Sequence, residues 1–181
     1  MYVWEQRKLK DVSNVYDGTH QTPAYTREGI MFLSVENIQS LRSNKFISED
    51  DFKRDFKTFP KYGDVLITRI GSIGKANIFQ ENIPAAYYVS LALLKVKSEQ
   101  FNSFFIMHWL GSPAVQKDIW SKTLHIAFPK KINKNELSKV SGYIPHLYEQ
   151  SNIENLLSGL DKLIAANQRK HAAFAINSYL R

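Results

Sequence analysis

The sequence predicts an α+β protein in which a domain of mixed strands and short helices is followed by one long C-terminal helix. Two observations lead to this fold class. Short β-branched and apolar runs, such as Ile30–Val35 and Val65–Ile70, are separated by turn residues through the first half of the chain. From Glu149 to the end the chain contains no proline, and its apolar residues recur at helical spacing. We therefore expect a domain over residues 1–147 and a helix over 148–181.

Local signals place the first elements. Ser48–Phe56 opens with a serine and three acidic residues, which favours a helix that Ser48 caps. Val65–Ile70 and Lys75–Phe79 are strand candidates, and the glycine-flanked turn between them predicts a β-hairpin.

Apolar runs place the next elements. Tyr87–Val96 is the most apolar run and is predicted to form a single central strand. Phe101–Leu110 is predicted to be a helix that stops near glycine, and a second helix starts at Pro113. Trp109 and Trp120 lie on adjacent helical faces, and we expect both in the core.

The C-terminal helix carries an apolar stripe that its own domain is too short to cover. At about 1.5 Å per residue the helix would reach roughly 50 Å. The stripe consists of Ile153, Leu156, Leu157, Leu160, Leu163, Ile164 and Phe174. Such a stripe requires a partner, so we expect the helix to pair as a coiled coil in a homodimer. Asn167, Gln168 and His171 interrupt the stripe; they either fix the register of the pair or mark where the helix turns outward.

The composition excludes several classes of protein. The chain has 181 residues and no cysteine, which removes disulfides and thiolate chemistry and fits a cytoplasmic location. No apolar run approaches the roughly 20 residues of a membrane span, so we expect no membrane partner. His20 and His125 lack the spacing of metal ligands, and we predict no metal site.

The positive charge lies on the domain rather than on the helix. The net charge is +7, and residues 1–148 hold 20 of the 24 basic residues against 14 of the 17 acidic residues. Lysines are concentrated over Lys117–Lys139, which holds six of them. A basic surface of this kind attracts phosphate, although a solvated lysine-rich loop would have the same composition.

Three segments carry the side chains that could contact a nucleic acid. The polar loop after residue 16 supplies Thr19, His20 and Gln21 for contacts to base edges. The alternative is that Asp17 and Thr19 only cap the amides of their own loop. The glycine turn supplies Arg69, Ser72 and Lys75 for contacts to phosphates or base edges. The alternative is that its glycines only supply the positive φ that a tight turn requires. The best candidates lie in the basic segment: Lys122, Thr123, His125, Lys130 and Lys131.

No catalytic residue is predicted. The stretch Arg69–Ala76 departs from a phosphate-binding loop, because the motif requires glycine in place of Arg69 and serine or threonine in place of Ala76. An adenine methyltransferase requires an Asn/Asp-Pro-Pro-aromatic motif, and Ile144–Leu147 lacks its first residue and its second proline. We find no carboxylate cluster, nucleophile dyad or cofactor loop, so we expect neither an enzyme nor a cofactor.

Seven motifs, taken in order, resemble the DNA-specificity subunit of type I restriction–modification systems. They are DGTHQTP at 17–23, GIMFLSVENI at 29–38, GDVLITRIGSIGKANI at 63–78, YYVSLALLKVK at 87–97, GSPAVQKDI at 111–119, IPHLYEQ at 144–150 and LLSGLDKLIAANQRK at 156–170. The resemblance covers essentially the whole chain. Family members usually carry two target-recognition domains, each followed by a conserved helix, whereas this sequence has one of each. It is therefore either a natural half-length protein or an excised half.

The resemblance implies a non-catalytic role. Each target-recognition domain of the family reads one part of a split DNA target in the major groove, and the helices act as a spacer. Modification subunits bind S-adenosylmethionine and methylate adenine, and a restriction subunit cuts unmodified DNA. Here residues 1–147 would be the reader and 148–181 the spacer and dimerisation helix. The alternative is a regulatory decoy that docks through its helix without reading DNA.

Overall fold

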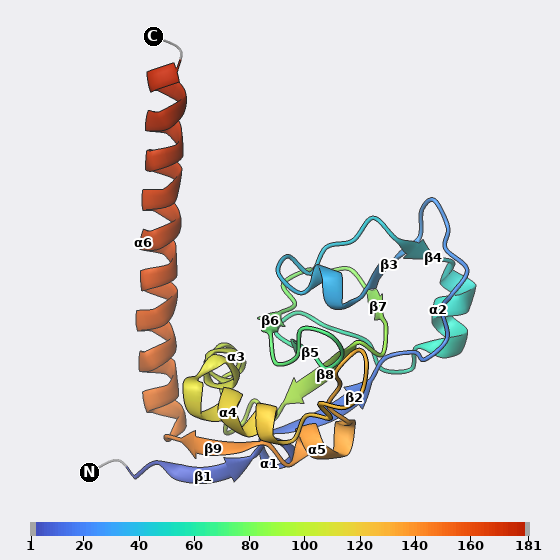
Figure 1. Cartoon of the computed structure of the whole chain (residues 1–181), viewed down its shortest axis with the longest axis horizontal. Coiled ribbons are helices and arrows are strands. Elements are labelled where there is room, and N and C mark those ends of the chain that lie inside the picture. The colour runs from blue at the N-terminus through green and yellow to red at the C-terminus, as the bar shows by residue number, and fades with distance from the viewer. Residues whose placement is uncertain (1–2, 180–181) are drawn as a thin grey trace.

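The computed structural model describes residues 3–179, with side chains through His171. It has the α+β architecture expected from the sequence, with a domain of small sheets and short helices from which a long helix, α6 (Leu147–Tyr179), projects at one end. Figure 1 shows that α6 meets the domain only at its foot, beside the N-terminal strand β1 (Glu5–Lys8).

The strands form three small sheets. The first pairs β1 with β9 (Ser141–Ile144) in antiparallel fashion and so joins the two ends of the domain. The second is antiparallel throughout and contains, in spatial order, β2 (Ser13–Asp17), β8 (Leu91–Val96), β5 (Val65–Thr68) and β6 (Ala76–Ile78). The third contains, in spatial order, β4 (Phe46–Ile47), β3 (Ile30–Leu33) and β7 (Ala85–Tyr87), and β3 runs parallel to β7.

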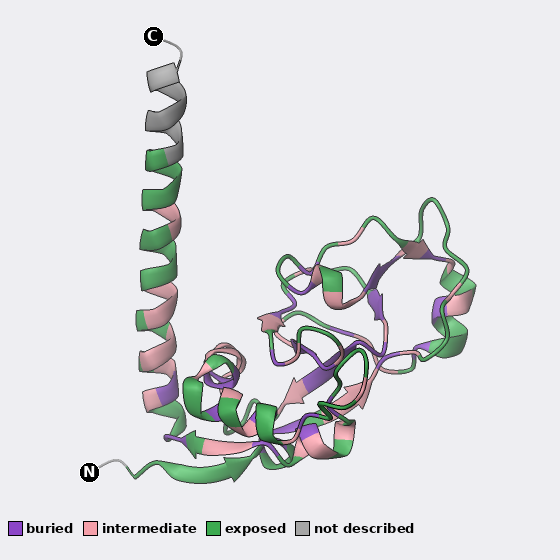
Figure 2. Cartoon of the chain, in the orientation of Figure 1, coloured by how far each residue is buried: buried purple, intermediate pink, exposed green. Residues whose placement is uncertain are grey.

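Short helices complete the domain. They are α1 (Leu9–Val12), the 3₁₀ turn Val35–Asn37, α2 (Glu49–Asp55), α3 (Ser103–Gly111), α4 (Pro113–Ser121) and α5 (Lys134–Ser138). The largest core cluster joins the four-stranded sheet to α3 and α4, with Ile67, Leu94, Phe105 and Trp109 among its buried members. Figure 2 shows this buried region between sheet and helices, whereas most of α6 is exposed or half-buried.

Several local predictions are confirmed. Ser48 caps α2, because its hydroxyl accepts the amide hydrogen bond of Asp51 at 3.1 Å. The hairpin forms between β5 and β6, and both turn glycines adopt the left-handed conformation, with φ of +80° at Gly71 and +87° at Gly74. Pro113 occupies the start of α4, as its missing amide hydrogen favours.

The single strand expected over Tyr87–Val96 is wrong. The chain ends β7 at Tyr87, turns, and begins β8 at Leu91 in a different sheet. The turn is closed by a hydrogen bond from the Leu91 amide to the Tyr88 carbonyl at 2.9 Å, and the hydroxyl of Ser90 accepts the amide of Val35 at 3.0 Å. Both β7 and β8 are buried, so the sequence is apolar on both sides of the bend and its hydrophobic pattern does not reveal the bend.

A buried glutamine fixes the foot of α6 to the domain. Gln150 is only 1% exposed, and its side-chain oxygen accepts the amide hydrogen bond of Asn102 at 2.9 Å. Its nitrogen donates to the carbonyls of Pro145 at 2.8 Å and Gln100 at 3.3 Å. Asn102 in turn caps α3, because its side chain accepts the amides of the first turn. One side chain therefore joins the start of α6 to the start of α3.

Replacing Gln150 with alanine is expected to destabilise the domain by about 2–3 kcal/mol, because it leaves the half-buried amide of Asn102 and the buried carbonyl of Pro145 without partners. Thermal unfolding checks this value. Asn152→Ala, which truncates an exposed amide in the same helix, is the matched control and should change the stability by less than about 0.5 kcal/mol. Equal stabilities of the two variants would contradict the anchoring role.

Candidate nucleic-acid interface and assembly helix

The structure brings the three candidate DNA-contact segments together. The Gly71 amide donates to the Lys130 carbonyl and the Ile132 amide to the Arg69 carbonyl, both at 2.9 Å, so the β5–β6 turn lies against the loop after α4. The loop after β2 joins them through an ion pair between Asp17 and Arg69. We call residues 17–22, 69–75 and 122–131 the three-loop surface.

The β5–β6 turn is held by hydrogen bonds within it and to α4. The Thr68 hydroxyl accepts the Lys75 amide at 3.0 Å and donates to the Ser72 carbonyl. The Gln116 side chain donates to the Gly74 carbonyl at 2.8 Å, and it lies so close that a Cβ at Gly74 would meet it at 2.9 Å. The turn is therefore fixed in position, with Ser72 and Lys75 exposed at its surface.

The loop after α4 is built around an exposed tryptophan. Trp120 is 55% exposed, whereas Trp109 is 5% exposed, so the prediction of a core position is right for Trp109 and wrong for Trp120. The reason is that α4 turns Val115 and Ile119 to the core, and Trp120 follows outside that face. The His125 ring lies 4.2 Å from the Trp120 ring, and the Lys130 ammonium lies 4.8 Å from its centre in a cation–π contact.

Lysines supply the positive charge of the three-loop surface. Lys75, Lys130 and Lys131 are exposed and form no ion pair with any residue that the structure describes. Lys122 is different, because its ammonium lies 2.5 Å from the Asp118 carboxylate. Burial opposes the charge of Asp118, but hydrogen bonds from Lys122 and the Ser141 amide outweigh it and hold the Asp118 pKa below its ordinary value.

Two of the candidate contact residues lie inside the domain instead of at its surface. Arg69 is buried and its guanidinium pairs with Asp17, whose other carboxylate oxygen lies 3.7 Å from the Lys134 ammonium. Thr123 is buried and its hydroxyl donates to the Ile119 carbonyl at 2.9 Å. Both side chains hold the loops in place, and neither presents its polar group to a ligand.

The loop after β2 is partly ordered by its own threonine. The Thr19 hydroxyl accepts the Gln21 amide at 3.2 Å, which is the capping alternative that the sequence left open. Its backbone pairs with Tyr87 and Val89. His20 and Gln21 are exposed beside it. Within residues 3–171, no three His, Asp or Glu side chains gather in a way that could hold a metal ion.

Two apolar residues of the three-loop surface are absent from the residues that the sequence predicted. Ile126 is 99% exposed and Phe128 is 103% exposed, at the tip of the loop after α4. Their position in the stretch HIAFPKK could have identified them. Large apolar residues stand next to two lysines there, and the apolar residues recur with neither helical nor strand spacing.

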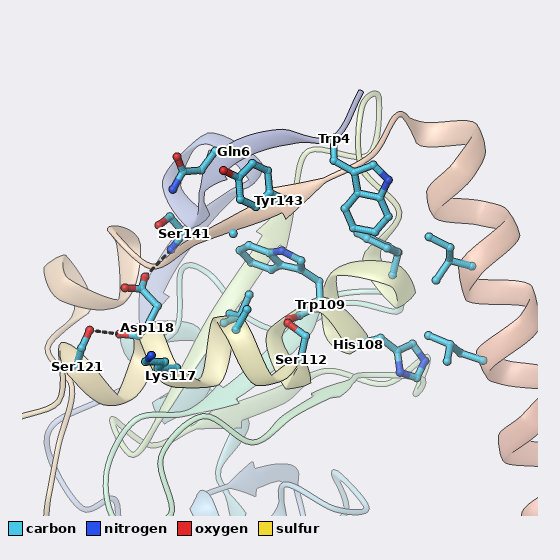
Figure 3. A pocket seen from close by; sticks show the side chains of 16 residues that line it. Trp4, Gln6, His108, Trp109, Ser112, Lys117, Asp118, Ser121, Ser141 and Tyr143 are labelled. Carbon is cyan, nitrogen blue, oxygen red and sulfur yellow. Dashed lines mark hydrogen bonds between the residues drawn. The ribbon is translucent and has the colours of Figure 1, made fainter. Parts of the chain in front are cut away.

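The foot of α6 borders an apolar pocket of about 620 Å³ between α3, α4, β9 and the helix. Figure 3 shows Trp4, Trp109 and Tyr143 around it, with Asp118 at the other end. The indole nitrogen of Trp109 is buried and has no hydrogen-bond partner among the described residues. Ile153 and Leu157 line the pocket from α6, so the pocket continues the stripe of the helix.

Beyond the pocket the stripe is open to solvent. Leu156, Leu160, Leu163 and Ile164 are between 47% and 65% exposed in the single chain, and Ile153 packs against the domain core. The side chain of Phe174 lies outside the described residues. Among the described helices none is both long and apolar enough to cross a membrane.

Comparisons with known proteins agree with this architecture. The family model for the type I restriction modification DNA specificity domain matches residues 1–173. Three solved structures superpose at low identity, which relates the folds. A chain from a study of complex assembly and conformational transition of the type I R-M system has a TM-score of 0.71 at 22% identity over 93% of this chain. The HsdS subunit from Thermoanaerobacter tengcongensis gives 0.69 at 21% over 92%.

The third structure, the type I restriction-modification S subunit from M. genitalium, gives a TM-score of 0.65 at 16% identity over 89% of this chain. The matches cover 41%, 39% and 40% of those three chains, so this chain spans about two fifths of their length. None of the curated proteins matches the sequence. The match of the family model over almost the whole chain shows that this protein belongs to the type I restriction–modification DNA specificity family.

Proposed function

We propose that this chain is the specificity component of a type I restriction–modification complex and reads one part of a split double-stranded DNA target through its three-loop surface. The observation that carries the proposal is the convergence of three segments, distant in sequence, into one surface with exposed lysines. The family match supports this interpretation and gives no support to the alternative of a docking decoy.

The contacts divide by chemistry. Lys75, Lys130 and Lys131 bind phosphates, which sets the position of the reader on the duplex. His20 and Gln21 carry donors and acceptors that match base edges in the major groove. Arg69 and Thr123 act indirectly, because they fix the loops that present these side chains.

The remaining functions belong to partners. The modification subunits bring S-adenosylmethionine and methylate adenine, and the restriction subunit acts through the same complex. Residues 1–147 form the reader, and 148–181 form the spacer and dimerisation helix. We place the complex in the cytoplasm, together with its DNA target.

The assembly is a homodimer in which two α6 helices pair as an antiparallel coiled coil. The exposed stripe supports this arrangement, since four large apolar side chains of one helix face lie open in the single chain. The pocket at the foot of α6 extends that surface onto the domain. A two-fold dimer presents two identical readers, so its target is an inverted repeat interrupted by a spacer.

Co-expression tests the proposal. DNA from a methylation-free host should contain N6-methyladenine when this chain is expressed with its modification subunit, and none when either is expressed alone. Mass spectrometry of the hydrolysed DNA gives the amount. Methylation that depends on a full-length specificity subunit and falls when this chain is added would instead indicate the decoy.

A further inference from the structure

The loop after α4 ends in an apolar tip that has no structural partner among the described residues. Ile126 and Phe128 are 99% and 103% exposed, so neither side chain contributes to the core of its own domain. Large apolar side chains are rarely left this open without a binding role when they stand together. The tip is therefore a candidate contact with another molecule.

The base of this loop is firmly held. The Leu124 amide donates to the Lys131 carbonyl at 2.8 Å, which closes the loop, and the Gly71 amide donates to the Lys130 carbonyl at 2.9 Å. The Trp120 ring supports the Lys130 ammonium at 4.8 Å. The apolar tip consequently projects from a fixed base within the three-loop surface.

The charges beside the tip match a nucleic acid. Lys130 and Lys131 follow Phe128 by two and three residues, and two residues of chain span at most about 7 Å. An ammonium group can therefore reach a phosphate while the ring stands at the base pairs of the same duplex. An apolar protein partner would instead leave two ammonium groups facing its surface, which is unfavourable.

We infer that Phe128, assisted by Ile126, inserts between neighbouring base pairs of the bound duplex and unstacks them. Apolar wedges of this kind kink DNA by partly opening one base step. Lys130 and Lys131 hold the backbone beside the step while the ring replaces the stacking between the separated base pairs. This inference rests on the proposed function, since it describes how the same surface meets its DNA.

The test uses the chain assembled with its modification subunits and a duplex that carries the methylated motif. 2-Aminopurine replaces one adenine at a time, at positions other than the methylated base, because methyltransferases turn that base out of the stack themselves. The fluorescence should rise at one step in each half of the target. Phe128→Ala should abolish the rise and weaken binding roughly 10- to 100-fold, without changing the salt dependence or the melting temperature.

Ile83→Ala is the matched control, because Ile83 is exposed in the loop at the end of the β5–β6 hairpin opposite the Gly71 turn. It should leave binding and fluorescence unchanged. Wild-type protein that binds its motif without a rise at any position, or a rise that persists in Phe128→Ala, would overturn the wedge and leave the proposed function standing. Loss of the modification subunits from Phe128→Ala would overturn it in favour of a protein-docking tip. Failure of the proposed function is distinct, because then no motif is methylated.

Discussion

Replacing Lys75, Lys130 and Lys131 together with glutamine is expected to weaken DNA binding roughly 100-fold near physiological salt. Each lysine is exposed on the three-loop surface and forms no ion pair with a described residue, so each is available for a phosphate. Each phosphate that is no longer neutralised by a lysine reduces the steepness of the slope of log affinity against log salt by about 0.9. The triple variant should therefore flatten the slope by up to about 2.7. Fluorescence anisotropy over a series of salt concentrations measures both quantities.

A second triple variant controls for net charge. Lys8, Lys10 and Lys162 are exposed and lie outside the three-loop surface. Their replacement with glutamine changes the net charge of +7 by the same three units. This variant should keep nearly the wild-type slope. Equal slopes for the two triple variants would mean that long-range charge alone binds the DNA and that the three-loop surface makes no phosphate contact.

Leu160→Asp should separate the assembly into single chains. Leu160 lies at the centre of the exposed stripe, and a two-fold pair would bury it twice. Removing two such side chains costs about 3–6 kcal/mol of association energy. The two new carboxylates add to this cost, because burying them in the interface would remove their hydration. The dissociation constant should rise roughly 10²- to 10⁴-fold. Sedimentation equilibrium or light scattering at micromolar concentration reports the mass.

Asn155→Asp adds the same carboxylate on another face, about 140° around the helix from Leu160 at 100° per residue. Asn155 is exposed, and its substitution should leave the mass at that of the wild type. An unchanged mass for Leu160→Asp would show that the stripe is not the seam between copies. The domain of the monomeric variant should remain folded, because Leu160 makes no contribution to the described core clusters.

The elements that the sequence predicted well depend on nearby residues. The cap at Ser48, the hairpin turn at Gly71 and Gly74, and the start of α4 at Pro113 all follow from the backbone preferences of one or two residues. The stripe of α6 follows from its regular spacing. Each of these features is determined by residues that are close together in the sequence, so the sequence alone is enough to predict it.

The errors arose where distant segments decide the outcome. The bend between Tyr87 and Leu91 separates two sheets, yet both sides are buried and apolar, so the pattern is continuous across it. Trp120 is a large aromatic residue of the kind that usually lies in a core. It follows Ile119 on α4, however, and lies outside the buried face of that helix. Hydrophobic pattern alone does not separate these cases.

The sequence predicts the candidate site as three groups of residues and not as one surface. Its assembly depends on pairs such as Asp17 with Arg69 and Gly71 with Lys130, which are far apart in sequence. The first of these pairs also explains why the Arg69 side chain is buried, since a carboxylate from another loop pairs with its charge. Ile126 and Phe128 escape prediction because exposure is a property of the folded chain.

The most direct test of the account is the sequence map of N6-methyladenine in DNA from a methylation-free host that expresses this chain with its modification subunit. Two identical readers on paired helices predict one symmetric motif, interrupted by a spacer of fixed length and methylated on both strands. An asymmetric motif would contradict the homodimer, because it requires two different readers. The absence of any motif, with the modification subunit shown to be active beside a full-length specificity subunit, would contradict the claim that this chain reads DNA as a homodimer.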